Sequence, residues 1–134
     1  MPHLIVEYSG NLEGRVDMRG LCDTLRRAAI ETGVFPMPGI RVRAVRCDIF
    51  SIADGNPENA FIDISIRLRA GREMDAKKRA TEAVFEAART FLAAHFSAIP
   101  LALSLEMRDI DPELSPKCGS IREHLARREQ GEAC

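Results

Sequence analysis

The chain has 134 residues, which is enough for one domain that buries a sizeable core. Its 19 basic and 20 acidic residues give a formal net charge of −1, so the composition lacks the basic excess of a nucleic-acid-binding protein. No apolar run approaches the roughly 18 residues that span a bilayer, and no signal peptide is recognisable. We therefore expect a cytoplasmic protein without a membrane segment.

The chain opens with a methionine followed by proline, and a small second residue permits removal of the methionine by an aminopeptidase. The mature chain would then begin at Pro2, whose secondary amine titrates near neutral pH. Burial penalises the charged form of an amine, so such a nitrogen at the mouth of a cleft can act as a general base. The alternative is a proline that only begins a strand, where it removes no ladder hydrogen bond.

The first half of the chain reads as strand, helix and strand. Residues 2–8 are rich in β-formers, and residues 17–32 carry apolar side chains at helical spacing. Asp17 is a candidate N-cap for this helix, and Gly33 is a candidate residue for its C-terminal cap. After a stretch interrupted by prolines, residues 40–52 read as the second strand.

The second half repeats this plan. Residues 61–69 alternate between apolar and polar side chains, which predicts a half-buried strand. Residues 74–96 form the next helical pattern, and residues 101–107 form the last strand. The apolar face of the 61–69 strand comprises Ile62, Ile64, Ile66 and Leu68, and its polar face comprises Asp63, Ser65, Arg67 and Arg69.

The order of elements predicts an α+β fold made of a tandem βαβ repeat, with a four-stranded sheet and two helices on one face. The sheet's other face would then be solvated or packed against further copies of the chain, and the pattern favours an oligomer. Residues 1–112 are expected to form the single domain. Residues 113–134 read as a C-terminal extension with a short charged helix near 121–129, which packs on a neighbouring subunit or frays.

The four cysteines are dispersed along the chain, at Cys22, Cys47, Cys118 and Cys134. They include no C-x-x-C pair and no histidine at a spacing suited to a shared metal ion. This pattern predicts thiols in a reducing compartment and no metal site.

Six short segments in register resemble the 5-carboxymethyl-2-hydroxymuconate isomerase family of the tautomerase superfamily. The match runs in order from Pro2 to about Pro112 and leaves out the tail. The segments are PHLIVE at 2–7, TGVFP at 32–36, GIR at 39–41, ADG at 53–55, AGR at 70–72 and LALS at 101–104.

The resemblance implies a cofactor-free 1,3-allylic isomerisation in the degradation of homoprotocatechuate. In that family a 2-hydroxymuconate-type dienol becomes its α,β-unsaturated ketone, and the amino-terminal proline moves the proton from the 2-hydroxyl to a distant carbon. By this resemblance Pro2 is the catalytic residue and the partners are a small carboxylate substrate and, in a homotrimer, two further copies of the chain.

Two arginines fall at matching motif positions, Arg41 in GIR and Arg72 in AGR. The resemblance places Arg41 near the 2-oxygen and the C1 carboxylate, and Arg72 on a distal carboxylate. Arginine suits this role because its planar fork matches a carboxylate with two donors. His3 is expected to be structural, because neighbouring strand residues point to opposite faces. A set of other arginines is expected to form interface pairs: Arg43, Arg46, Arg67 and Arg69.

Other activities stay open at this point. One is a different tautomerase-superfamily reaction that uses the same proline, such as a phenylpyruvate-type tautomerase or a haloacrylate hydratase. The other is a non-catalytic oligomeric binding module on the same sheet. A retained Met1 would favour the module, because the Pro2 nitrogen would then be a tertiary amide without a basic lone pair.

Overall fold

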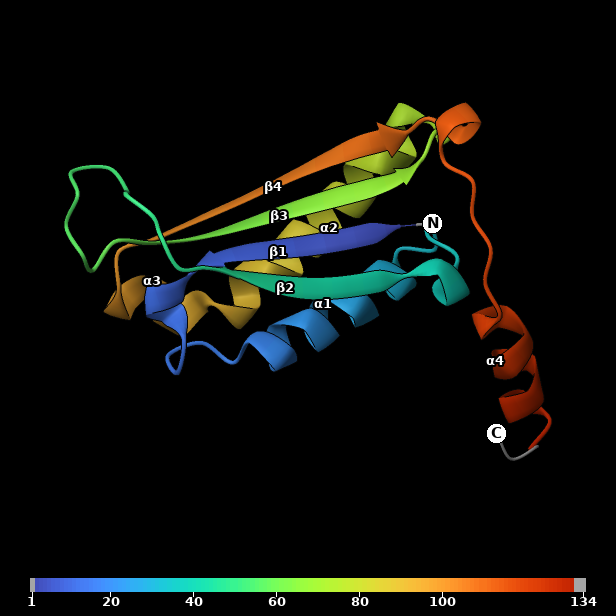
Figure 1. Ribbon diagram of the computed structural model, residues 1–134, viewed down its shortest axis with the longest axis horizontal. Helices are drawn as coiled ribbons and strands as arrows, with labels where there is room; N and C mark the ends of the chain where they lie inside the picture. The colour runs from blue at the N-terminus through green and yellow to red at the C-terminus, as the bar shows by residue number, and fades with distance from the viewer. Residues whose placement is uncertain (1, 132–134) are drawn as a thin grey trace.

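Four strands form one mixed sheet in the order β2-β1-β3-β4 in the computed structural model, which describes residues 2–131 (Figure 1). Parallel pairs lie at both edges, β1 with β2 and β3 with β4, and an antiparallel pairing of β1 with β3 joins the two halves. The strands are β1 (His3–Ser9), β2 (Arg41–Cys47), β3 (Ala60–Arg69) and β4 (Leu101–Ile110).

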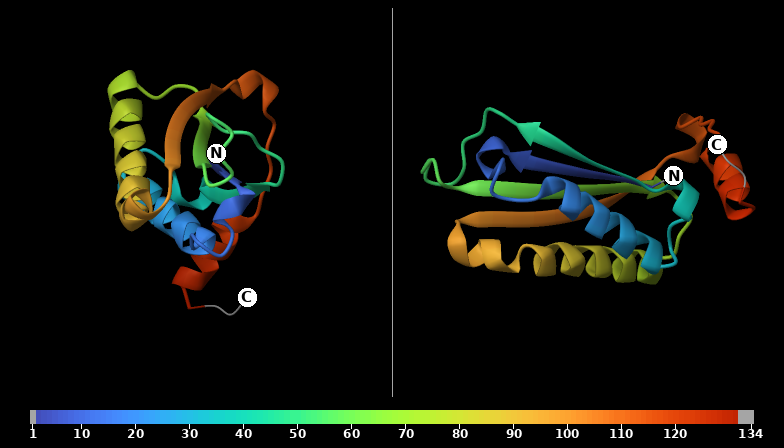
Figure 2. Two further views of the ribbon diagram at one scale, coloured as in Figure 1. Left: turned by 90° about the vertical axis from the view of Figure 1, so that its left-hand side faces the viewer. Right: turned by 90° about the horizontal axis from the view of Figure 1, so that it is seen from below.

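The two long helices, α1 (Met18–Glu31) and α2 (Met74–Phe91), lie side by side on one face of this sheet (Figure 2). The Asp17 side chain caps α1 by accepting a hydrogen bond from the Gly20 N–H at 3.0 Å. Gly33 follows the helix with a φ of 71°, a conformation that glycine adopts without steric cost. The tandem βαβ fold with both helices on one face is therefore confirmed, as is the cap at each end of α1.

The core lies between the sheet and the helices. Side chains from β1 and β3 that face the helices are fully buried, in agreement with the alternation seen in residues 61–69. This packing fixes the sheet's register, because a shift of one residue would turn every buried side chain to the opposite face. The buried set includes Leu4, Val6, Ile62, Ile64 and Ile66 from the strands, and Leu21, Leu25, Ala80, Val84 and Ala88 from the helices.

The second strand is shorter than predicted. We expected it over residues 40–52, but β2 ends at Cys47. Its neighbour in the sheet is β1, and the last pair in their register is Ser9 with Cys47. Residues beyond Cys47 therefore have no strand beside them, and Ile49 is 97% exposed in the long connection to β3.

The helix predicted over residues 74–96 is two helices. It stops at Phe91, and a short helix, α3 (Ala93–Ala98), follows. Leu92, fully buried, separates them with φ −94° and ψ 4°, and its carbonyl accepts a tight-turn hydrogen bond from the His95 N–H at 2.8 Å. The same turn brings His95 Nε2 to 3.1 Å from the carbonyl oxygen of Arg15.

The chain after β4 runs past the end of the sheet at which β1 begins (Figure 1). It forms a single 3-10 turn, η3 (Pro112–Leu114), then an extended stretch and the helix α4 (Ile121–Glu129). The predicted charged helix is thus present, and it contacts η2 (Met37–Gly39), the 3-10 turn that precedes β2.

Cys22, Cys47 and Cys118 are free thiols, while Met1 and Cys134 lie outside the described residues. Within residues 2–131, no helix has the length and apolar character needed to cross a membrane.

Candidate active site

Pro2 lies at the edge of a cavity of about 270 Å³ at the end of the sheet where β1 begins. Its side chain is fully buried, and its carbonyl accepts a hydrogen bond from the Arg41 N–H at 3.1 Å. This bond extends the parallel β1–β2 pairing, in which His3 lies opposite Arg41, by one residue. The structure therefore brings together Pro2 and Arg41, two of the residues singled out from the sequence, at one cavity.

A second cavity, of about 360 Å³, adjoins the first and is lined by His3, Arg41 and Arg69. The two cavities have Arg41, Lys117 and Cys118 in common. Arg41 thus stands between the space beside Pro2 and the space beside His3, where a ligand that spans both would pass it.

His3 belongs to the second cavity and does not line the cavity of Pro2, as the alternation of strand residues predicted. The Arg43 guanidinium, which can only donate, lies 3.2 Å from His3 Nδ1, so this nitrogen accepts. Burial, and then the positive charges of Arg67, Arg43 and Arg41, lower the pKa of His3 below its ordinary value of 6.5. The imidazole is accordingly neutral at pH 7.

Arg72 lies at the same end of the sheet but outside the linings of these two cavities. Its Nη1 donates a hydrogen bond to the carbonyl oxygen of Arg69 at 3.1 Å. Arg69 lines the cavity that contains His3, and its expected interface pair stays a prediction. Arg69 and Arg41 thus line one cavity, while Arg72 is held against the backbone of the turn after β3.

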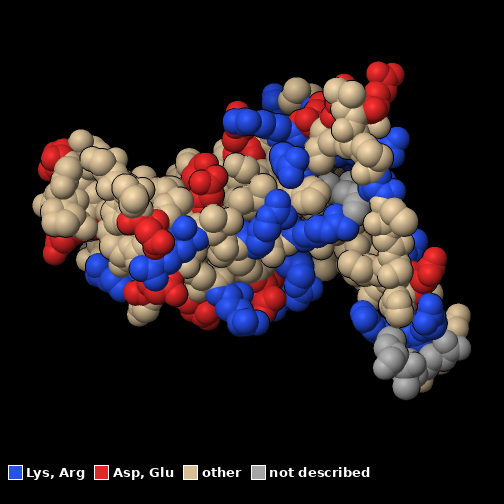
Figure 3. Space-filling model, in the orientation of Figure 1, with Lys and Arg blue, Asp and Glu red and all other residues tan. Residues whose placement is uncertain are grey.

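The C-terminal extension contributes two cations to the cavity of Pro2, Lys117 and Arg122. Sequence reasoning missed both, because no motif marks them and their place depends on the path of the chain after β4. None of the described residues that line the two cavities is Asp or Glu. Figure 3 shows Lys and Arg gathered over this end of the sheet, so the arrangement suits a ligand with several negative charges.

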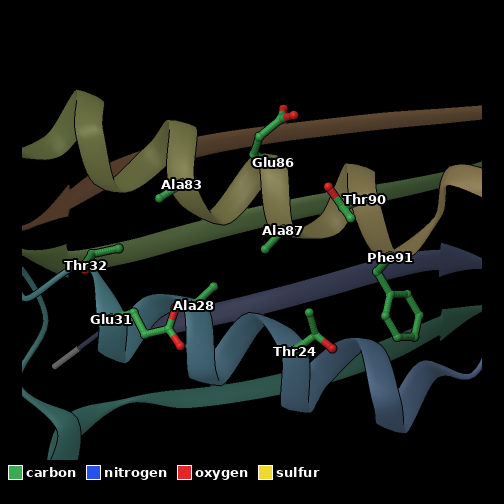
Figure 4. Close-up of a pocket in the computed structure, with 9 residues that line it drawn as sticks. All are labelled: Thr24, Ala28, Glu31, Thr32, Ala83, Glu86, Ala87, Thr90 and Phe91. Atoms are coloured by element: carbon green, nitrogen blue, oxygen red, sulfur yellow. The ribbon is translucent and has the colours of Figure 1, made fainter.

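A third hollow, of about 680 Å³, is a groove between α1 and α2 (Figure 4), and neither Pro2 nor Arg41 lines it. Its charged lining residues are Glu31 and Glu86, which would repel a carboxylate ligand. Small side chains make up most of the rest, and no Lys or Arg is among the described residues that line the groove. The remaining lining residues are Thr24, Ala28, Thr32, Ala83, Ala87, Thr90 and Phe91.

A metal centre finds no support among residues 2–131, where no three His, Cys, Asp or Glu side chains form a group able to hold an ion. The chemistry available at this end of the sheet is that of a buried proline at the second position, a neutral imidazole and several cations.

Comparison with known proteins identifies a family of isomerases that this chain resembles. The family model for 5-carboxymethyl-2-hydroxymuconate isomerase matches residues 2–125. The 5-carboxymethyl-2-hydroxymuconate Delta-isomerase of Escherichia coli is 35% identical over 121 residues, which cover 90% of this chain and 96% of that protein. The family match therefore reaches beyond β4 and includes Lys117 and Arg122.

Solved structures agree with the sequence comparisons. The crystal structure of a 5-carboxymethyl-2-hydroxymuconate isomerase from Deinococcus radiodurans R1 superposes with a TM-score of 0.86 at 30% identity, covering 92% of this chain and 93% of that one. The wild-type asymmetric trimer of F6 fused 4-OT shares the fold with a TM-score of 0.66 at 20% identity, covering 93% of this chain and 99% of that one. With a family model that spans nearly its whole length and a curated relative above 30% identity, the chain belongs to the 5-carboxymethyl-2-hydroxymuconate isomerase family.

Proposed function

We propose that this chain is an enzyme that isomerises 5-carboxymethyl-2-hydroxymuconate, a dienol, to its α,β-unsaturated ketone. Membership of the isomerase family supports the reaction class. The observation that carries the proposal is the position of Pro2, buried beside Arg41 at a cavity whose described lining residues include cations and no Asp or Glu. Such a site fits a polycarboxylate whose oxygen gains negative charge during the reaction.

Pro2 transfers the proton. Once Met1, which lies outside the described residues, has been removed, the nitrogen of Pro2 is a secondary amine. Its burial and the positive charges nearby disfavour the protonated amine, which keeps the nitrogen available as a base. The amine takes the proton from the 2-hydroxyl of the dienol, and the resulting ammonium returns it to a distant carbon of the dienolate. The steps balance, because the proton removed from oxygen is returned to carbon and the substrate gains or loses no electrons.

Two arginines bind the substrate in this proposal. Arg41 stabilises the dienolate oxygen and holds the C1 carboxylate, a role supported by its place between the two cavities. Arg72 holds a distal carboxylate from the same end of the sheet. Its present hydrogen bond to the Arg69 carbonyl leaves other donors of the guanidinium for a ligand.

The test is an ultraviolet assay of 5-carboxymethyl-2-hydroxymuconate isomerisation, with removal of Met1 first verified by intact mass. Rapid conversion by the processed protein, and none by the same protein carrying an N-terminal extension before Pro2, is the expected result. No conversion by fully processed protein would contradict the proposal. Assays with phenylpyruvate enol and with 3-haloacrylates then decide between the alternative activities of the superfamily.

We also propose a homotrimer assembled through the sheet face opposite the helices. This face carries apolar side chains on β1 and β2 among its charges, and Val45 is 45% exposed there. A trimer among the structurally similar proteins also supports the proposed homotrimer. Size-exclusion chromatography with light scattering measures the mass directly: three times the 14.9 kDa of one chain is expected, and the mass of one chain would contradict the proposal.

A further inference from the structure

The segment after β4 is held at the mouth of the candidate site. The Asp111 side chain accepts a hydrogen bond from the Glu113 N–H at 2.9 Å, and the Ser115 hydroxyl donates to the Asp111 carbonyl at 2.7 Å. These bonds fix the turn that leaves β4, while α4 contacts η2, whose Pro38 and Gly39 line the cavity of Pro2. Between these two anchors, Lys117 and Cys118 border both cavities.

The cations of this segment are uncompensated. Neither Lys117 nor Arg122 has an ion-pair partner within residues 2–131, although the chain as a whole carries slightly more acidic than basic residues. Both side chains are exposed and line the cavity of Pro2, so an anion bound there would meet them at little desolvation cost. Their charge is available for a ligand.

The chemistry of the substrate supplies a matching anion. A muconate carries a carboxylate at each end, and the 5-carboxymethyl group adds a third. Arg41 and Arg72 have been assigned to the C1 and a distal carboxylate, which leaves one carboxylate without a cation. Lysine presents a compact point charge on a flexible stem, which suits a carboxylate at the end of a flexible CH₂ group.

We infer that Lys117, assisted by Arg122, binds the carboxymethyl carboxylate and makes the C-terminal segment the determinant of specificity for a tricarboxylate over a dicarboxylate. This inference rests on the proposed function. Lys117 acts in binding and takes no part in the proton transfer at Pro2. Its removal therefore raises KM for the tricarboxylate and leaves kcat nearly unchanged.

The experiment compares two substrates, 5-carboxymethyl-2-hydroxymuconate and 2-hydroxymuconate, which lacks the carboxymethyl group. Lys117→Ala is expected to raise KM for the first about tenfold or more, the loss typical of a charge-assisted contact, and to change KM for the second less than about twofold. Lys117→Arg, which keeps the charge, should restore most of the affinity. Arg127→Ala is the matched control, since Arg127 lies in the last turn of α4 and outside the cavity lining.

Equal KM values for Lys117→Ala, Arg127→Ala and the wild type with the tricarboxylate would overturn the inference, as would an equal loss with both substrates. A wild type that converts neither substrate contradicts the proposed function. Calorimetric titration with propane-1,2,3-tricarboxylate, which cannot react, then decides the inference alone. Binding that is about tenfold weaker in Lys117→Ala than in Arg127→Ala supports it, and equal binding or no binding by the wild type overturns it.

Discussion

The carbonyl oxygen of Pro2 accepts a hydrogen bond from the backbone N–H of Arg41 at 3.1 Å. The proposed base and the proposed oxyanion-stabilising residue are thus joined through the backbone of two parallel strands, with His3 opposite Arg41 in the next pair. Backbone pairing of this kind fixes the separation of the two Cα atoms, and the ring holds the Pro2 nitrogen close to its own Cα. Both residues are therefore kept at the same end of the sheet before the substrate arrives, which favours a site of fixed geometry.

Replacing Pro2 by Ala in the mature chain is expected to lower kcat at least about 10²-fold, the lower end of what a positioned general base contributes. Alanine offers a primary amine on a residue without a ring, so the nitrogen loses the fixed orientation that the pyrrolidine ring gives it. The ultraviolet assay measures the rate, and circular dichroism measures whether the fold is retained. Intact mass verifies the first residue of each protein.

The control for this experiment is wild-type protein with two residues added before Pro2. Here the ring is unchanged, and only the amine is lost, because the nitrogen becomes an amide. Activity should fall to background. Undiminished turnover in either protein would mean that the proline nitrogen is not the base.

Replacing Arg41 by Ala is expected to raise KM and to lower kcat, because the same guanidinium holds a carboxylate and stabilises the dienolate. A charge-assisted contact of about 2–3 kcal/mol predicts a fall in kcat/KM of roughly 30- to 150-fold. Arg41→Lys should recover only part of this loss, since an ammonium cannot offer the two-pronged geometry. Full activity in Arg41→Ala would remove Arg41 from the site.

Replacing Arg72 by Ala separates direct binding from support of a neighbour. Because its Nη1 donates to the Arg69 carbonyl, loss of the side chain also loosens the turn that follows β3. A substrate contact predicts a rise in KM of about tenfold for each polycarboxylate, with kcat nearly constant. Arg69→Ala is the comparison, because Arg69 lines the second cavity directly. Wild-type kinetics in Arg72→Ala would exclude a role in binding.

The lowered pKa of His3 predicts a pH dependence of stability. Burial and the charges of Arg67, Arg43 and Arg41 disfavour the imidazolium in the folded state, while the unfolded chain protonates near pH 6.5. Between the folded pKa and 6.5 the unfolded state binds more protons, so stability is complete above 6.5 and falls as the pH decreases through this window. Thermal unfolding at pH 7.5 and 5.5 should show a smaller decrease for His3→Gln than for the wild type. Equal decreases would contradict this assignment.

Local patterns predicted the fold well where burial dictates the pattern. Strict alternation placed Ile62, Ile64, Ile66 and Leu68 on the buried face of β3, and Asp17 marked the start of α1 correctly. The errors arose where the end of a strand or helix depends on residues far away in the sequence. β2 stops at Cys47 because β1 ends opposite it, and the helix after β3 breaks where buried Leu92 tightens the last turn.

The candidate site divides in the same way. Pro2 and Arg41 were identifiable because short motifs mark them, and the structure places both at one cavity. Lys117 and Arg122 were not identifiable, because the route of an irregular segment is set by tertiary contacts that its own sequence does not reveal. Arg69 was not identified as a cavity residue, because a sheet-face pattern does not show which strand end borders a cavity.

The core of this fold predicts a large difference between two isoleucines. Ile64 is fully buried in β3, and truncation to Ala removes three methyl or methylene groups and leaves a cavity, at a cost of about 2–5 kcal/mol in the free energy of unfolding. Ile49, after β2, is 97% exposed. Ile49→Ala is therefore the matched control and should change the free energy of unfolding by less than about 0.5 kcal/mol. Urea unfolding followed by circular dichroism measures both. Similar values for the two variants would contradict the placement of Ile64 between the sheet and its helices, because only a buried side chain loses its packing on truncation.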